Sequence, residues 1–225
     1  MEEIYNIPNS IYIYNEKNIK NSIKFNELKK FIIDNFGISK IKIITLKENI
    51  VIIDGIILNL YSTNKKFLTL PYSKEKNICH IIITEKIFVT LDDFKKPHIR
   101  PVIFSEPSII SIPGIVEGPA KPKEYYIYKE KYTRIGIWEL KKDEVKEKFK
   151  GKFIDYKDKR ITNVMKGYIS QALFFYITGN PFCEDKNCRV FNSHWQKDLI
   201  HSQIESGKFC KVHKKIMEKM KNRGI

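Results

Sequence analysis

Short apolar runs dominate the first half of the chain. Their isoleucine, valine and tyrosine side chains are typical of strands, because β-branched and aromatic residues fit a pleated surface. Polar or charged residues bound each run. The pattern predicts strands at residues 10–14, 40–45, 50–58, 79–83, 86–90, 101–104 and 108–112.

Apolar residues elsewhere follow the spacing of a helix. Leu28, Phe31 and Ile32 share one face of a helix predicted at 25–35, and Gly37 would end it. The same pattern predicts a charged helix at 141–150, an apolar helix at 162–178 ending at Gly179, and basic helices at 196–204 and 209–222. Clustered prolines and glycines predict an extended loop at 113–122, after which the chain resumes at 125–128.

The order of these elements indicates the fold class. The chain opens β-α-β-β, which favours an α/β or α+β fold with a mixed, twisted sheet and packed helices. It contains no internal repeat and no low-complexity linker. We therefore expect a single domain over residues 1–225, with the sheet in 1–160 and a C-terminal part in 161–225.

Composition narrows the class of protein. An apolar fraction of 42% over 225 residues indicates a globular chain with a sizeable core. Asp54, Asn59 and Glu85 interrupt the most apolar stretches well before the roughly 18 residues that a bilayer requires, which predicts no membrane span. The acidic start, Met1-Glu2-Glu3, is unlike a secretory signal and predicts a cytoplasmic protein.

The net charge of +15 would attract anionic partners such as nucleic acid. Lysine and isoleucine are abundant while alanine occurs only at Ala120 and Ala172, a bias that AT-rich coding also produces. The charge therefore allows a nucleic-acid partner without requiring one.

Three of the four cysteines and one histidine form two close pairs near the end of the chain. Cys183 and Cys188 are spaced C-x4-C, and Cys210 and His213 are spaced C-x2-H. Each short spacing lets one turn or helix end present two ligands to the same ion, as tetrahedral zinc requires. We predict one structural Zn²⁺ in a closed Cys3His site; the alternative is free thiols, or a disulfide, beside a surface histidine. Cys79 has no partner in spacing and is expected to be a buried thiol.

The sequence around this cluster resembles the archaemetzincins. The resemblance is carried by Gly179-Asn180-Pro181-Phe182-Cys183, by Cys188-Arg189-Val190 and by Phe209-Cys210-Lys211-Val212-His213. Archaemetzincins are metzincin-type zinc peptidases with the motif HExxHxxGxxHC-x4-CxM followed by CxxC. The spacer before Cys210 is two residues longer here, and His213 stands where the family usually has cysteine. The resemblance implies a metzincin-like fold with an edge strand, expected at 108–112, above the cleft.

The same resemblance assigns the catalytic positions. If Gly179 is the motif glycine, the three histidines that hold the catalytic zinc and the glutamate that activates water fall on Ala172, Leu173, Tyr176 and Phe182. The methionine of the Met-turn falls on Val190. None of these residue types is retained, so the resemblance implies the fold without the catalytic zinc. Val164, Tyr168, Ala172 and Tyr176 follow one another at helical spacing and predict an apolar, aromatic face instead.

Three functional hypotheses remain open. The first is a non-catalytic archaemetzincin-like protein that binds a peptide or protein in a vestigial cleft. The second is a zinc-stabilised nucleic-acid-binding module whose basic C-terminal helix meets phosphates through Lys208, Lys211, Lys214, Lys215, Lys219, Lys221 and Arg223. The third is a divergent zinc metallopeptidase. It would need an unrecognised site, for which His194, Asp198 and His201 offer a second set of metal ligands.

Overall fold

The computed structural model describes residues 5–16, 19 and 23–223, and of Arg223 the backbone alone. Its main sheet has five strands in the order β2-β1-β5-β9-β8. The strands are β1 (Ser10–Asn15), β2 (Ile41–Thr45), β5 (Ile78–Thr84), β8 (Val102–Ile103) and β9 (Ser108–Ser111). The first four in this order run parallel, and β8 runs antiparallel to β9 at the edge. The α/β class with a mixed sheet is confirmed.

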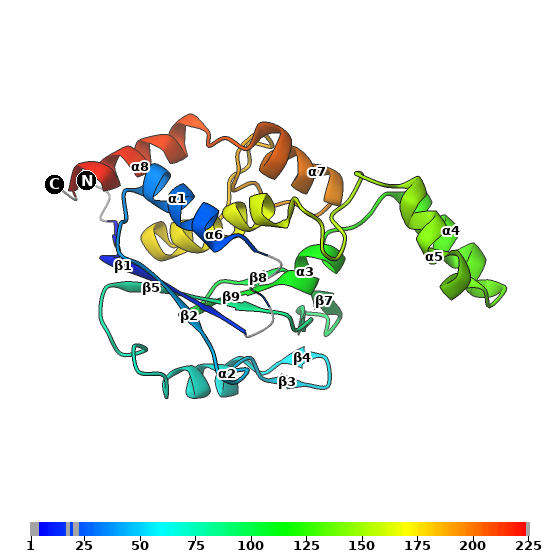
Figure 1. Cartoon of the computed structure of the whole chain (residues 1–225), viewed down its shortest axis with the longest axis horizontal. Coiled ribbons are helices and arrows are strands. Elements are labelled where there is room, and N and C mark those ends of the chain that lie inside the picture. The colour runs from blue at the N-terminus through cyan, green and yellow to red at the C-terminus, as the bar shows by residue number, and fades with distance from the viewer. Residues whose placement is uncertain (1–4, 17–18, 20–22, 224–225) are drawn as a thin grey trace.

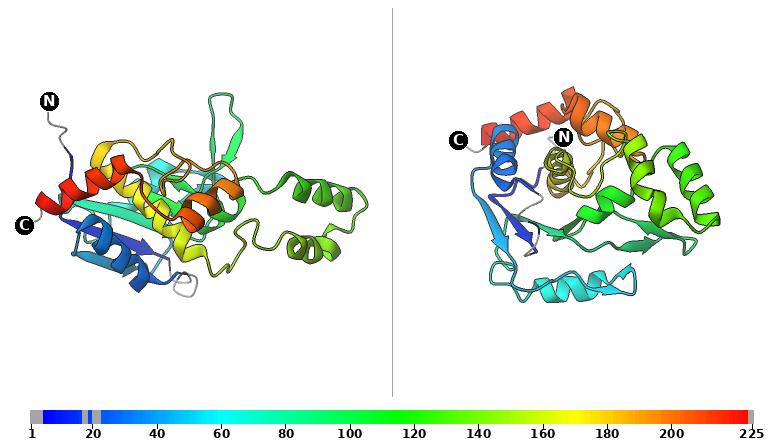
Figure 2. Two further views of the ribbon diagram at one scale, coloured as in Figure 1. Left: turned by 90° about the horizontal axis from the view of Figure 1, so that it is seen from above. Right: turned by 45° about the vertical axis from the view of Figure 1, so that its right-hand side comes forward.

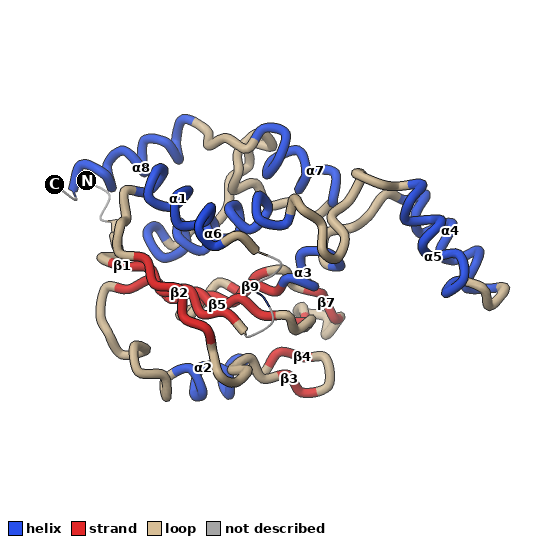
Figure 3. The backbone as a smooth tube through the Cα atoms, in the orientation of Figure 1, coloured by secondary structure: helices blue, strands red, loops and turns tan. Residues whose placement is uncertain are grey.

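The central strands β1 and β5 are buried at every position, because both faces of the sheet are covered. On one face, Ile11, Ile13 and Ile81 join the larger core. On the other face, Tyr12, Tyr14 and Ile82 join a smaller core with Phe67. Figures 1 and 3 show the sheet between these two layers.

The larger core lies under α1 (Phe25–Phe36), α6 (Ile161–Thr178) and α8 (Lys211–Arg223). In Figure 1 these helices lie above the sheet together with α7 (Gln196–Ile200), which continues into a π-helical segment, η2 (His201–Ser206). Ring contacts join them, since Phe36 and Phe209 both pack on Phe174 of α6. Helix α6 is thereby held in the middle of the molecule.

The opposite face carries α2 (Leu60–Phe67) and a second, smaller sheet. Its strands are β3 (Ile53–Asp54), β4 (Ile57–Leu58), β6 (Val89–Leu91) and β7 (Pro97–Ile99), in the order β3-β4-β6-β7. Strands β6 and β7 form a hairpin in which Thr90 lies opposite His98. The chain passes from β7 directly into the edge strand β8.

Three helices connect β9 to α6. The short α3 (Ile112–Glu117) follows β9, and then α4 (Lys123–Arg134) and α5 (Trp138–Lys148) form a helical hairpin. Figure 2 shows this hairpin projecting from the rest of the molecule. It has its own small core, made by Tyr125, Val145, Phe149 and Phe153.

Several predicted strands need correction. Residues 108–112 were expected at the sheet edge, but β9 pairs on both sides and is fully buried, and the edge strand is β8. The strand expected at 50–58 is a hairpin of β3 and β4, because Gly55 adopts a positive φ of 62° and turns the chain. The strand expected at 86–90 begins only at Val89, and β7 was not predicted.

The predicted loop at 113–122 is partly helical. Pro113 occupies the first turn of α3, where its missing N–H costs nothing, and the Ser111 hydroxyl accepts a hydrogen bond from the Gly114 N–H. A Cβ at Gly114 would lie 2.3 Å from the Arg100 carbonyl oxygen, so this glycine serves close packing. Residues 125–128 belong to α4, and α2 was not predicted. The remaining predicted helices shift by a few residues at their ends.

Within the described ranges, no helix has both the length and the apolar character that crossing a bilayer demands.

Candidate metal centre and the adjoining cleft

Helix α6 leads the chain into the cysteine cluster. It ends at Gly179, whose positive φ of 75° and N–H bond to the Phe175 carbonyl form a left-handed cap. The loop after it is shaped by side-chain turns: the Thr178 hydroxyl accepts from the Asn180 N–H, and the Asn180 amide oxygen accepts from the Phe182 N–H. These turns bring Cys183 back beside α6.

The segment 183–191 is a second turn, closed by backbone hydrogen bonds. The Cys183 N–H donates to the Val190 carbonyl at 3.0 Å, and the Cys188 N–H donates to the Asp185 carbonyl at 2.9 Å. Cys188 also forms a bridge with Lys208, which places the two cysteine pairs side by side. The turn therefore brings Cys183 and Cys188, the two cysteines of the C-x4-C pair, close together.

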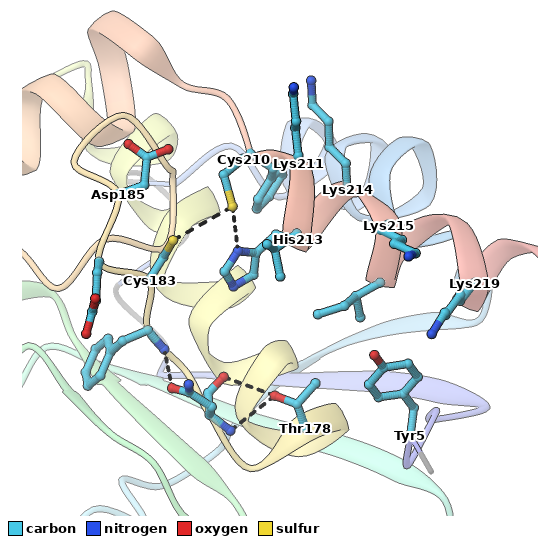
Figure 4. Close-up of a pocket in the computed structure, with 16 residues that line it drawn as sticks. Tyr5, Thr178, Cys183, Asp185, Cys210, Lys211, His213, Lys214, Lys215 and Lys219 are labelled. Carbon is cyan, nitrogen blue, oxygen red and sulfur yellow. Dashed lines mark hydrogen bonds between the residues drawn. The ribbon is translucent and has the colours of Figure 1, made fainter. Parts of the chain in front are cut away.

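The second pair lies at the start of α8. Cys210 immediately precedes the helix, and His213 lies in its first turn. Figure 4 shows Cys183, Cys210 and His213 turned toward one another. The Cys210 N–H donates to the Cys188 sulfur at 3.4 Å, an interaction that stabilises a thiolate.

The four ligand atoms form one compact cluster, all within 4.8 Å of one another. Cys183 Sγ lies 3.8 Å from Cys210 Sγ, and His213 Nδ1 lies 3.7 Å from Cys188 Sγ and 3.1 Å from Cys210 Sγ. Tetrahedral zinc with bonds of about 2.3 Å to sulfur has ligand separations of about 3.8 Å. All four cysteines are free thiols, so the disulfide alternative is wrong. The donor set and its spacing fit a metal ion.

Burial controls the charge of this cluster. It raises the pKa of the Cys188 thiol to about 12, raises the pKa of Cys183 and lowers the pKa of His213. Without a cation these groups would be neutral at physiological pH. Metal binding must therefore displace thiol protons, which makes binding stronger as the pH rises.

Arg189, next to Cys188, supplies a balancing charge that sequence reasoning missed. Its guanidinium is buried and donates to the carbonyl oxygens of Gly207 at 2.7 Å and Asn163 at 3.2 Å. Burial lowers its pKa to about 10, so it stays cationic at neutral pH, and the charge of Cys188 acts in the opposite direction on this pKa. Three thiolates with one divalent ion carry a single negative charge, which this cation offsets.

The positions that the resemblance assigns to catalysis are occupied by core and aromatic residues. Ala172 and Leu173 are fully buried in the larger core, as is Val190 at the Met-turn position. Tyr176 is partly buried against the same core. The Phe182 ring packs edge-on against Phe104 at 5.3 Å between centroids.

A cleft of about 470 Å³ stays open beside this aromatic contact. The edge strand β8 and the β6–β7 hairpin form one wall, α6 forms the floor through Tyr168 and Gln171, and residues 191–194 form the other wall. The cleft therefore lies between α6 and the edge of the main sheet, next to Phe182.

The suggested second metal site is not assembled. His201 bonds Asn187 at 2.9 Å and Glu205 at 3.0 Å, so both ring nitrogens are engaged away from His194 and Asp198. His194 lies in the loop before α7 and lines the cleft. Among the described residues, Cys183, Cys188, Cys210 and His213 are the one group of His, Cys, Asp or Glu with ligand spacing.

The basic residues of the C-terminal segment lie on and beside α8. Figure 4 shows Lys211 and Lys214 pointing away from the cysteine cluster, with Lys215 and Lys219 toward the hollow beside it. The Lys219 ammonium lies 5.3 Å from the Tyr5 ring centroid, and Lys221 donates to the Asp34 carbonyl. The backbone of Lys208 pairs with Cys188, and the side chain of Arg223 lies outside the described residues.

Comparison with known proteins supports a metallopeptidase-like fold for this chain. A family model described as "Probable metallopeptidase family (DUF6775)" matches residues 40–220. The crystal structure of archaemetzincin from Methanopyrus kandleri matches with a TM-score of 0.56 and 8% sequence identity over 97% of each chain. At that identity the structural match shows the fold, which confirms the metzincin-like architecture. No curated protein matches the sequence.

Proposed function

The chain belongs to the probable metallopeptidase family, and on this premise we propose that it is a non-catalytic member that binds peptide or protein segments in the cleft. One structural Zn²⁺ held by Cys183, Cys188, Cys210 and His213 would stabilise the fold. Reduced thiols of this kind suit a cytoplasmic protein. The observation that carries the proposal is the burial of Ala172 and Leu173, at the positions that the resemblance assigns to catalysis, beside a cleft that is still open.

The chemistry of the catalytic positions supports this proposal. Metal-assisted peptide hydrolysis needs imidazoles that hold the ion and a carboxylate that activates water. Ala172, Leu173 and Phe182 have no atom that ligates a metal or transfers a proton. Tyr176 has a phenol, but burial raises its pKa, so it would stay protonated.

Proteolysis assays test the loss of catalysis. We expect zinc-loaded protein to leave casein and quenched fluorescent peptides intact. Added chelator should leave this absence of cleavage unchanged. Turnover that chelator abolishes and that persists through repeated purification would instead establish the divergent-peptidase alternative.

Binding assays test the cleft. Asn192→Trp would place a large ring in the cleft, where Asn192 lines the wall, and should abolish binding of labelled peptides. Asn26→Trp, at an exposed position on α1, is the matched control and should leave binding unchanged. Equal binding by both variants would place the peptide elsewhere on the molecule.

A nucleic-acid partner is the second candidate. The observation that favours it is that Lys211, Lys214 and Lys215 take part in no ion pair among the described residues, although they follow one another on α8. Retention of the protein on RNA or DNA should then fall with rising salt. It should fall further in the variant with glutamine in place of Lys211, Lys214 and Lys215. Absence of retention at moderate salt would remove this candidate.

A further inference from the structure

The open cleft is lined by a buried side-chain acceptor that has no hydrogen-bond partner among the described residues. Gln171 on α6 is 3% exposed, and its Nε2 donates to the Phe191 carbonyl at 3.2 Å. Its Oε1 is buried and accepts no hydrogen bond within the part of the chain that the structure describes. An unpaired buried carbonyl oxygen costs free energy, so the cleft is built to receive an N–H donor at this point.

Tyr168 lies one helical turn before Gln171 and also lines the cleft floor. No hydrogen bond involves its hydroxyl within the described chain, and burial raises its pKa, so it remains a neutral phenol. A phenol O–H donates to a carbonyl as readily as it accepts. The floor therefore offers an acceptor and a donor together, the complement of a peptide group.

The charged side chains that line the cleft are basic. Arg100 follows β7, and its Nε donates to the Thr90 hydroxyl at 2.8 Å, which fixes the guanidinium on the face of the hairpin shared by Thr90 and His98. All three residues line the cleft, and no Asp or Glu is among the lining residues that the structure describes. Asp92, the nearest acid on the hairpin, bonds His98 instead. Arg100 thus lines the cleft and takes part in no ion pair among the residues that the structure describes.

We propose that this cleft selects peptide segments that carry a carboxylate, with Arg100 binding the carboxylate while Gln171 Oε1 accepts a backbone N–H. This inference rests on the proposed peptide-binding function and adds its specificity. The aromatic end of the cleft, formed by Phe104, Phe182 and Phe191, accepts an apolar side chain next to the acidic group. The carboxylate belongs either to an Asp or Glu side chain or to a peptide C-terminus, which present the same chemistry to Arg100.

Three fluorescein-labelled octapeptides test the proposal by fluorescence anisotropy with zinc-loaded protein. Each contains one Leu; the first has a Glu and an amidated C-terminus, the second a Gln and an amidated C-terminus, and the third a Gln and a free C-terminus. We expect either the first or the third to bind at least about tenfold more tightly than the second, since charge-assisted hydrogen bonds have that strength. Which of the two binds identifies the source of the carboxylate.

Two variants test the roles of Arg100 and Gln171. Arg100→Gln should abolish the preference for peptides with a carboxylate. Gln171→Met should weaken the binding of all three peptides to the same extent, because it removes the acceptor for the backbone N–H. Arg134→Gln is the matched control, since Arg134 is exposed on α4 and pairs with Glu130. Circular dichroism and zinc content establish that each variant is folded.

The outcomes separate the two proposals. Equal binding of all three peptides to the wild-type protein, or a preference that survives in Arg100→Gln, overturns the selectivity while peptide binding stands. Binding of no peptide to the zinc-loaded protein overturns both.

Discussion

At the residue scale, Gly167 shows how tightly α6 is packed against η2. A Cβ there would lie 1.8 Å from Gln203 Oε1, and Gln203 is 1% exposed and donates to the Arg189 carbonyl. Alanine inside a helix ordinarily stabilises it by about 1 kcal/mol relative to glycine. Here we expect Gly167→Ala to lower the free energy of unfolding by about 1–3 kcal/mol, because overpacking displaces Gln203. Urea unfolding measures the change.

The double variant provides the control. In a Gln203→Ala background the space beside residue 167 is empty, so Gly167→Ala should become neutral or stabilising. The same loss in both backgrounds would show that the glycine is needed for another reason.

His80 makes a second residue-scale prediction, on the opposite face of the sheet. Its ring shares a hydrogen bond with the Tyr14 hydroxyl at 3.0 Å, and burial lowers its pKa below the usual 6.5, against the raising effect of Glu75. Between pH 6.5 and the lower pKa of the folded state, His80 is protonated in the unfolded chain and neutral in the folded chain. Stability should therefore fall as the pH drops through 6.5 toward the lower pKa of the folded state.

Comparison with His80→Gln isolates this effect, because glutamine does not titrate and retains a hydrogen bond to Tyr14. We expect the variant to lose less stability than the wild type between neutral pH and pH about 5, measured by thermal unfolding. Parallel curves for the two proteins would assign the acid sensitivity to other groups.

At the scale of elements, local spacing was sufficient for some features and not for others. The Cys3His cluster was predictable because each pair of ligands lies within one turn. Helix α4 was not, since Tyr125, Tyr128 and Tyr132 have a helical spacing that the four-residue apolar run at 125–128 does not reveal by itself. Arg100 and Gln171 meet in the cleft only through packing of distant segments, so no local pattern marked them.

The α4–α5 hairpin makes an element-scale prediction, because its core is separate from the two cores around the sheet. The ring of Phe149 contacts Tyr125 and Tyr128 there. Truncation of a buried phenylalanine costs about 3–5 kcal/mol. Phe149→Ala should therefore speed hydrogen exchange across residues 123–148 while strands β1 and β5 stay protected.

The reciprocal variant tests that independence. Phe88 is fully buried in the core beneath the sheet, so Phe88→Ala should weaken protection of β1 and β5. If Phe149→Ala also exposes those strands, the hairpin folds as one cooperative unit with the sheet.

At the scale of the whole molecule, the metal centre joins two segments that are distant in sequence: the turn at 183–191, which follows α6, and the start of α8. Removing a ligand would loosen the attachment of α8, whose Met217 and Met220 belong to the larger core.

We expect Cys210→Ser and His213→Ala each to reduce bound zinc from about one ion per chain and to lower the melting temperature by several degrees or more. Cys79→Ala, a buried thiol outside the cluster, should keep its zinc. Elemental analysis with calorimetry measures both quantities, and chelator should lower the wild-type melting temperature toward that of the ligand variants. Unchanged metal content in both variants would show that this cluster does not hold the ion.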